Sequence, residues 1–158
     1  MKINFVDRGT AKRYVEDGAF VLNQLDFISI SDTWGETHQM RELWLGNKIE
    51  ANAALFLKFA DIDDNSSGFT DKDADRIVQF AQESYIKRKD IVVHCFAGIS
   101  RSGAVAKFVN EYWALGDVVL DTYVGHNRHV YYKLLEQAGV PTQRQYYAKL
   151  EKDIGTDS

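Results

Sequence analysis

Several features are scarce or missing in this chain of 158 residues. There is one cysteine, Cys95, which excludes a framework of internal disulfides and is typical of a reducing compartment. No apolar run is long enough to span a bilayer, and the residues after Met1 lack the apolar core of a signal peptide. We therefore expect a soluble, cytoplasmic protein without a membrane partner.

Basic residues are also scarce relative to acidic ones. The chain has 19 Lys and Arg against 23 Asp and Glu, a net charge of -4, which argues against a nucleic-acid partner. The one basic cluster, residues 87–89, lies at the end of an expected helix, where cations also interact favourably with the helix dipole. His126 and His129 are close in sequence, but no third ligand has helical spacing with them, so we expect no metal.

The distribution of hydrophobic residues predicts the fold class. At 45% hydrophobic and 13% aromatic content, residues 1–158 are expected to form one domain with a sizeable core. Extended segments are expected at 2–6, 27–30, 53–59 and 91–95, and helices at 11–17, 71–89, 128–137 and 142–152, with a helix stop at 115–116. This alternation predicts an α/β fold with a mostly parallel central sheet of about four to five strands, flanked by helices.

The most informative segment is residues 94–103, His-Cys-Phe-Ala-Gly-Ile-Ser-Arg-Ser-Gly. It follows an apolar β-branched run and precedes a helical pattern that is clear from Ala104 onward. A loop between a strand and a helix N-terminus points unpaired N–H groups at one place, where the helix dipole also favours an anion. A phosphate-binding role is therefore expected for the loop residues Phe96, Ala97, Gly98, Ile99, Ser100 and Arg101.

Two residues of this segment have specific expected roles in holding a phosphoryl group. The planar guanidinium of Arg101 can bind two phosphoryl oxygens, which a lysine could not do. Gly98 permits a positive φ and a close approach of the backbone to the ligand.

The same electric field acts on Cys95. A cysteine that faces a helix N-terminus, with Arg101 beside it and a hydrogen-bond network through His94, is expected to have a pKa well below about 8.5. We therefore expect a thiolate at neutral pH. The alternative is that Cys95 is only a small buried residue at the end of a strand. The combination of residue types at these offsets favours the functional interpretation.

Residues His94, Cys95, Gly98, Arg101 and Ser102 resemble the signature of the cysteine-dependent protein tyrosine phosphatase superfamily, and residues 98–102 are most similar to its dual-specificity branch. The resemblance implies a phosphotyrosine phosphatase-like fold without a metal or cofactor. It also implies a phosphocysteine intermediate. Cys95 would attack phosphorus while Arg101 and the loop amides hold the equatorial oxygens, and Ser102 would assist the later departure of the thiolate.

In this family an aspartate on a loop after an earlier strand acts as general acid and then as general base. Asp61, Asp63 and Asp64 all follow the expected strand at 53–59. We favour Asp61 because it is the first of the three, and because residues 59–62 resemble the corresponding segment of small bacterial and phage members. Asp63 and Asp64 stay open as alternatives. Residues from Asp63 onward also match part of a calcium-binding loop, but its twelfth position is Ala74 instead of Glu.

Two classes of function stay open from the sequence. The first is a phosphatase that acts on phosphotyrosine, and also on phosphoserine or phosphothreonine, in phosphoproteins. The second is a phosphate-binding module without turnover. A third function, an RNA 5′-phosphatase, is disfavoured because the chain lacks the basic residues expected of an RNA-binding surface. The lipid-directed branch of the family carries lysines inside the loop, whereas residues 96, 97, 99 and 100 are uncharged, so we expect a phosphoprotein and not a phosphoinositide.

One further residue and one further segment bear on the expected site. Asn127 is either the N-cap of the helix expected at 128–137 or a support for the cysteine segment, and we favour the cap. Residues 31–42 could form one wall of the cleft, but their spacing assigns no role to any single residue.

Overall fold

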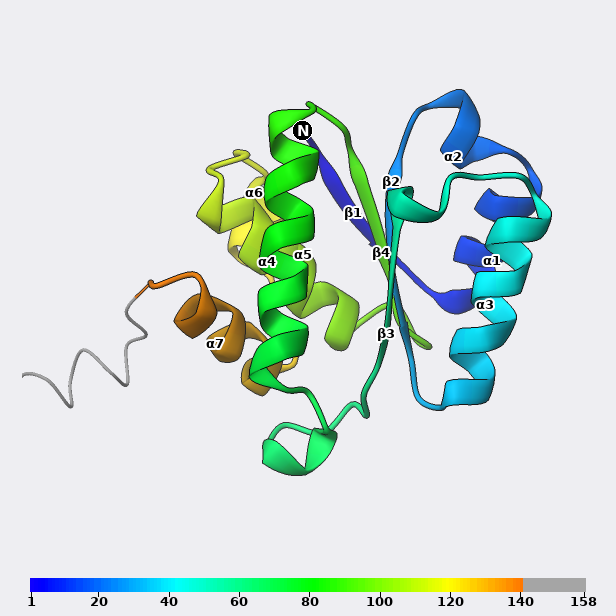
Figure 1. Ribbon diagram of the computed structural model, residues 1–158. Coiled ribbons are helices and arrows are strands. Elements are labelled where there is room, and N and C mark those ends of the chain that lie inside the picture. The colour runs from blue at the N-terminus through cyan, green and yellow to red at the C-terminus, as the bar shows by residue number, and fades with distance from the viewer. Residues whose placement is uncertain (141–158) are drawn as a thin grey trace, which may run out of the picture.

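A computed structural model describes residues 1–140, so the helix expected at 142–152 lies outside the described residues. The four strands are β1 (Ile3–Val6), β2 (Asp26–Ser31), β3 (Ala54–Lys58) and β4 (Ile91–His94). They form one sheet in the order β1-β4-β2-β3, and every pair is parallel (Figure 1). The prediction of an α/β fold with a mostly parallel sheet is confirmed.

Helices cover both faces of this sheet (Figure 1). One face carries α1 (Arg8–Glu16), α2 (Ala19–Leu22) and α3 (Trp34–Gly46); the other carries α4 (Asp71–Ile86), α5 (Arg101–Tyr112), α6 (Val118–Asp121) and α7 (Arg128–Gln137). Two short 3₁₀ turns, η1 (Ala51–Ala53) and η2 (Asn65–Ser67), flank β3. Within residues 1–140, no helix has both the length and the apolar character needed to cross a membrane.

The central strands supply side chains to two separate cores. Ile28 and Val93 pack with α4, α5 and α7, whereas Phe27 and Val92 pack with α1, α2 and α3. Successive side chains of a strand point to opposite faces, so a strand covered on both sides is apolar at every position. This explains the uninterrupted apolar run that begins β4.

Side chains cap the starts of four of the five long helices. The caps are Asp7 for α1, Thr33 for α3, Thr70 for α4, in a capping box with Asp73, and Asn127 for α7. In contrast, α5 begins after Ser100 with no side-chain cap. Its first N–H groups are therefore left to the loop that precedes it.

Some predicted boundaries were wrong by a few residues. The helix predicted to end at residue 89 ends at Ile86, because Arg88 takes a φ of 56° and donates back to the carbonyl of Tyr85. The stop expected at 115–116 comes earlier, after Tyr112, where Ala114 takes a φ of 50°. Helix α5 starts at Arg101, before the pattern from Ala104 suggested.

Candidate active site

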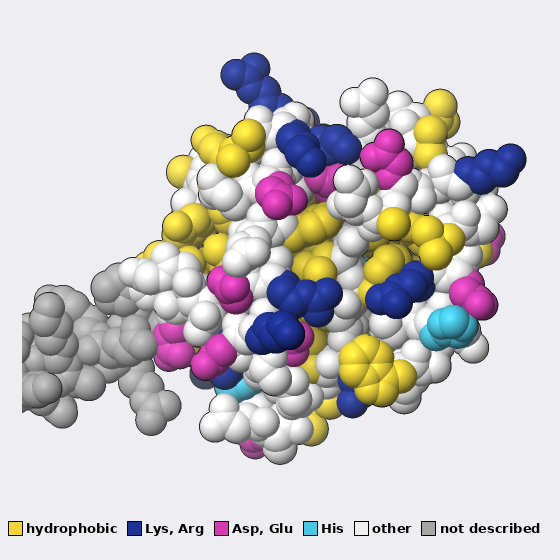
Figure 2. Space-filling view, viewed as in Figure 1, with side chains coloured by type: hydrophobic (Ala, Val, Ile, Leu, Met, Phe, Trp, Pro, Cys, Tyr) yellow, Lys and Arg dark blue, Asp and Glu magenta, His cyan; other side chains and the backbone are white. Residues whose placement is uncertain are grey.

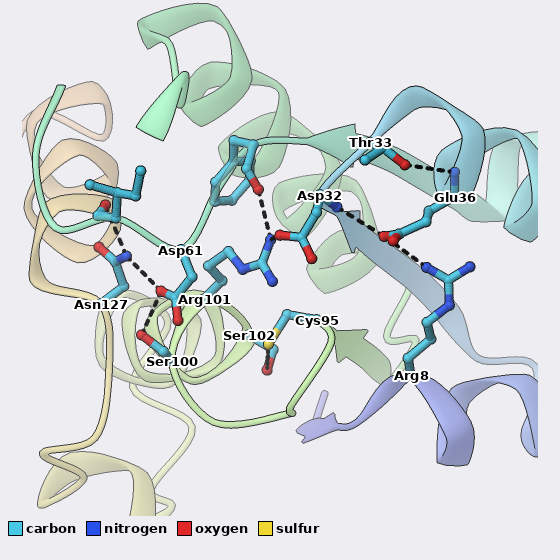
Figure 3. A network of polar contacts seen from close by, with 12 residues as sticks. Arg8, Asp32, Thr33, Glu36, Asp61, Cys95, Ser100, Arg101, Ser102 and Asn127 are labelled. Atoms are coloured by element: carbon cyan, nitrogen blue, oxygen red, sulfur yellow. Dashed lines mark hydrogen bonds and ion pairs between the residues drawn. The ribbon is translucent and has the colours of Figure 1, made fainter. Parts of the chain in front are cut away.

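The segment Cys95–Ser100, here called the cysteine loop, connects β4 to α5 at the carboxyl edge of the sheet. Because all the strands are parallel, the loops that follow β2 and β3 end at this same edge. Asp32, Asp61 and Cys95 are therefore brought close together from distant parts of the sequence (Figure 3). This edge is where open α/β sheets bind their ligands.

Three carbonyl groups of the cysteine loop point away from the sulfur and are held by neighbouring segments. The bonds are from Arg8 N to Phe96 O at 3.2 Å, from Tyr123 OH to Ile99 O at 2.6 Å and from Asn127 N to Ser100 O at 2.9 Å. With these carbonyls directed outward, the N–H groups of Gly98, Ile99 and Ser102 donate to the Cys95 sulfur. The result is a concave set of donors of the kind that binds anions.

Gly98 allows the loop to pack directly against the connection between β1 and α1. Its φ is 67°, and a Cβ added to it would lie 2.4 Å from Asp7 N and 2.5 Å from Val6 C. The expected positive φ is confirmed. The close approach that requires glycine is to the backbone of Val6 and Asp7, so the shape of the loop depends on that connection.

The environment of Cys95 favours its ionised form. Its side chain is buried, and its sulfur lies 3.2 Å from Ser102 Oγ. Burial alone raises the pKa of the thiol, but hydrogen bonds from the Ser102 hydroxyl and from the backbone N–H groups of Ser102, Ile99 and Gly98 outweigh burial and lower the pKa. The sulfur therefore lies among hydrogen-bond donors that stabilise a negative charge on it.

His94 touches the backbone of Cys95 and not its sulfur. Its Nδ1 lies 3.2 Å from the Cys95 carbonyl oxygen, its Nε2 lies 2.6 Å from Ser29 Oγ, and its ring stacks on Phe27. Burial, with the nearby Arg8 and Arg101, lowers the His94 pKa to about 4. The ring is therefore neutral at pH 7, and because a carbonyl only accepts, Nδ1 carries the proton. His94 thus anchors the end of β4, from which the cysteine loop begins.

The guanidinium of Arg101 is buried and held in one orientation. Its Nη1 donates to Asp32 Oδ1 and to the carbonyl oxygen of Phe59, each at 2.7 Å. Its Nε has no hydrogen-bond partner among the described residues. A buried donor without a partner is rare in folded proteins, so this group is available to a bound anion.

Asp32 is in turn fixed by a second ion pair (Figure 3). The Asp32 N–H donates to Glu36 Oε2 at 3.2 Å, and that same carboxylate oxygen pairs with Arg8 Nη1 at 3.0 Å. The chain of contacts therefore links the first turns of α1 and α3 to Arg101. Asp32 is a site residue that sequence reasoning missed, because residues 31–42 received no role.

Two sequence signals could have found Asp32. Thr33 and Glu36 have the spacing of a capping box, which marks the start of α3. Asp32 precedes this cap and follows an apolar strand, so it had to lie at the carboxyl edge of a parallel sheet.

The three candidate acids occupy different places. Asp61 Oδ1 accepts hydrogen bonds from Ser100 Oγ at 2.8 Å and from Asn127 Nδ2 at 2.9 Å, which puts it against the cysteine loop. Asp63 Oδ1 instead accepts from His129 N at 2.7 Å, at the start of α7. Asp64 caps η2 by accepting from Ser66 N. Of the three, Asp61 alone contacts the cysteine loop among the described residues.

The partial calcium-loop pattern lacks the helix that precedes a calcium-binding loop. A strand comes before it, Asp63 accepts from His129 N, and Asp64 caps η2. Residues 1–140 contain no group of three His, Cys, Asp or Glu side chains placed to hold a metal.

The side chain of Asn127 caps α7, as favoured from the sequence, whereas the cysteine loop is contacted by its backbone N–H, which donates to Ser100 O, and not by its side chain. Its Oδ1 accepts from Val130 N at 3.1 Å and so caps α7, while its Nδ2 donates to Asp61 Oδ1 and to Ile62 O. The side chain thus ties the start of α7 to the Asp61 segment.

The remaining loop side chains lie at the surface. Phe96 is 64% exposed and Ile99 is 54% exposed, and Ala97 is exposed as well. These side chains therefore point into solvent and are not part of the core.

No protein-family model matches the chain, and no curated protein sequence matches it. Solved structures do match. PTPMT1 in complex with PI(5)P has a TM-score of 0.54 at 17% identity over 86% of this chain and 89% of that chain. The PTP-2 phosphatase of Cydia pomonella has a TM-score of 0.52 at 13% identity over 94% and 83%. OH1 from the Orf virus, described as a tyrosine phosphatase with triple substrate specificity, has a TM-score of 0.51 at 16% identity over 85% and 81%.

These likenesses, at low identity, concern the arrangement of the chain. The protein has the α/β fold of the tyrosine phosphatases, and the predicted phosphotyrosine phosphatase-like fold is confirmed.

Proposed function

We propose that the protein hydrolyses phosphate monoesters on phosphoproteins, at phosphotyrosine and also at phosphoserine or phosphothreonine, through a phosphocysteine intermediate. The observation that carries this proposal is the position of the Cys95 sulfur, with a lowered pKa, at the centre of backbone N–H donors. The same donors that favour the thiolate would bind the equatorial oxygens of a phosphoryl group. The nucleophile and the electrostatic stabilisation thus share one loop.

In the first step, the Cys95 thiolate attacks phosphorus in line. The S–P bond forms as the bond to the leaving oxygen breaks, and the leaving oxygen takes a proton from Asp61. Oδ1 of Asp61 is occupied by Ser100 and Asn127, so Oδ2, which accepts no hydrogen bond from residues 1–140, is the atom that holds this proton. Arg101 supplies its free Nε–H to the charge that develops on the equatorial oxygens.

In the second step, a water molecule attacks the phosphocysteine and gives a proton back to Asp61. The P–S bond breaks, inorganic phosphate leaves, and the thiolate returns. The Ser102 hydroxyl, 3.2 Å from the sulfur, stabilises the departing thiolate with a hydrogen bond. His94 acts as a positioning residue, since it holds the backbone of Cys95 and does not reach the sulfur.

The experiment is hydrolysis of a generic aryl phosphate in the presence of a chelator. Wild type is expected to be active, Cys95→Ser inactive, and Asp61→Ala slower by about 10²–10⁴-fold with a flattened basic limb of the pH profile. Asp63→Ala is the matched control and should leave that limb unchanged, because Asp63 accepts from His129 N at the start of α7 and does not contact the cysteine loop. An inert wild type that still binds phosphopeptides would show a phosphate-binding module instead. A flattened limb in Asp63→Ala alone would move the acid role to Asp63.

A further inference from the structure

One edge of the sheet is open. Strand β3 is last in the sheet order and pairs only with β2 among the described strands. Phe59 N donates to Ser31 O at 3.1 Å, so the alternation of a strand directs the backbone groups of Phe56 and Lys58 away from β2. These outward N–H and C=O groups are available to pair with an added strand.

A cavity of about 250 Å³ lies along this edge, and we call it the β3 groove. Its apolar lining includes Ala54 and Phe56 of β3 and Leu45 of α3, and Leu45 is half exposed. Arg41 of α3 and Arg76 of α4 also line it. In Figure 2, dark-blue side chains flank yellow ones over the middle of the molecule, where Figure 1 shows β3.

The two arginines of the β3 groove lack acidic partners within the described residues. Arg8 and Arg101 each pair with a carboxylate, whereas no carboxylate of residues 1–140 lies within 4.0 Å of Arg41 or Arg76. The Arg41 guanidinium instead lies 5.3 Å from the centre of the Phe56 ring. In a chain with a net charge of -4, two unpaired cations beside an open strand edge favour an acidic partner.

We propose that the β3 groove binds an extended acidic segment of the phosphoprotein substrate as a strand added beside β3. The proposal rests on the proposed function, since the segment belongs to the molecule that carries the phosphate. Backbone hydrogen bonds to the edge supply affinity, and the arginines select acidic side chains. A phosphoinositide headgroup has no backbone to pair with Phe56 and Lys58, so the groove favours a polypeptide substrate.

The sheet order sets how far the docked segment lies from the phosphate. The added strand, β3, β2 and β4 are separated by three strand spacings, or about 14 Å. An extended chain covers about 3.3 Å per residue, so at least about five residues separate the phosphorylated residue from the first docked one. Because β3 runs toward Asp61, a segment along it ends at the carboxyl edge that holds Cys95.

The test compares two phosphopeptides. In both, an extended segment begins about six residues from the phosphotyrosine. The segment is acidic in one peptide, and in the other its acidic residues are replaced by Asn and Gln. The enzyme variant is Arg41→Glu/Arg76→Glu. Its control is Arg13→Glu/Lys87→Glu, which changes the same charge at exposed positions outside the groove. For the acidic peptide, KM should rise about 5–10-fold in the groove variant with kcat unchanged. Aryl phosphate hydrolysis should be unchanged in both variants.

Strand addition is tested separately with an acidic peptide, lacking phosphate, that is N-methylated at alternate residues. Fluorescence anisotropy should show weaker binding than for the unmethylated peptide, because N-methylation removes donors to the edge. Equal binding of the methylated and unmethylated peptides would overturn the groove proposal. Equal KM values of the wild-type enzyme for the acidic and the Asn/Gln-substituted phosphopeptide, while aryl phosphate is hydrolysed, would also overturn it. A concentration-dependent dimer that the groove variant abolishes, without any effect of peptide, would assign the edge to a second copy and also overturn it. Lack of aryl phosphate hydrolysis in wild type would instead refute the proposed function.

Discussion

Replacing His94 with Asn tests whether the buried neutral imidazole makes the stability of the fold depend on pH. Burial holds the pKa of His94 at about 4 in the folded protein, whereas an exposed histidine has a pKa of 6.5. Between these values the unfolded chain binds the proton more tightly. The stability that neutral His94 contributes is therefore complete above about pH 6.5 and is lost as the pH falls toward 4.

The size of this effect follows from the two pKa values. Wild type should lose about 2 kcal/mol of unfolding free energy from this group between pH 7 and pH 5, and about 3 kcal/mol by pH 4. In His94→Asn the side-chain amide can donate to the Cys95 carbonyl as Nδ1–H does, but it does not titrate. The variant should be less stable than wild type at pH 7, because the stacking on Phe27 is lost. It should not show the decrease in unfolding free energy that His94 causes in wild type as the pH falls.

Urea unfolding followed by tryptophan fluorescence at pH 7, 6 and 5 measures the difference. The stability gap between wild type and His94→Asn should narrow by about 2 kcal/mol from pH 7 to pH 5, and titrations shared by both proteins cancel. His38→Asn is the control for a histidine-to-asparagine change outside the core, since the His38 side chain is 69% exposed. A constant gap for His94→Asn would refute the assignment of a buried neutral ring.

Three further changes test the cysteine loop and two residues beside it. Gly98→Ala should lower the unfolding free energy by about 3 kcal/mol or more in thermal unfolding, because its Cβ would meet Asp7 N at 2.4 Å. Ser102→Ala removes a hydrogen bond that lowers the Cys95 pKa, so the acidic limb of activity and of thiol alkylation should move to higher pH. Asp32→Ala should lower kcat/KM about tenfold by freeing Arg101, and Asp32→Asn, which keeps an acceptor oxygen, should restore most of it.

Patterns confined to a few neighbouring residues were predictable from the sequence. The run at residues 91–93 predicted a strand covered on both faces, because apolar side chains at consecutive positions serve two cores. The offsets among Cys95, Gly98 and Arg101 predicted one loop, because a strand, a turn and a helix start are all local features. The helix at 128–137 was predicted with its observed bounds, since Asn127 is a side-chain cap.

Features that depend on distant contacts were not predictable. The pairing of Asp32 with Arg101 requires β2 to lie beside β4, and the strand order follows from packing and not from any one segment. Helix ends were displaced because Arg88 and Ala114 take positive φ values that usually favour glycine. Local hydrogen bonds close these helix ends, from Arg88 N to Tyr85 O and from Ala114 N to Glu111 O. Neither Arg88 nor Ala114 is the glycine that usually marks such an end, so the sequence did not indicate it.

The Asn127 side chain makes two kinds of contact at once. A primary amide has an acceptor and a donor on one planar group, so capping α7 with Oδ1 leaves Nδ2 to bind Asp61. An aspartate would cap the helix equally well but would place a second carboxylate against Asp61, and a serine is too short to reach both partners. The amide is therefore the side chain that caps the helix and also holds Asp61. Asn127→Asp should keep the fold while it weakens the hold on Asp61.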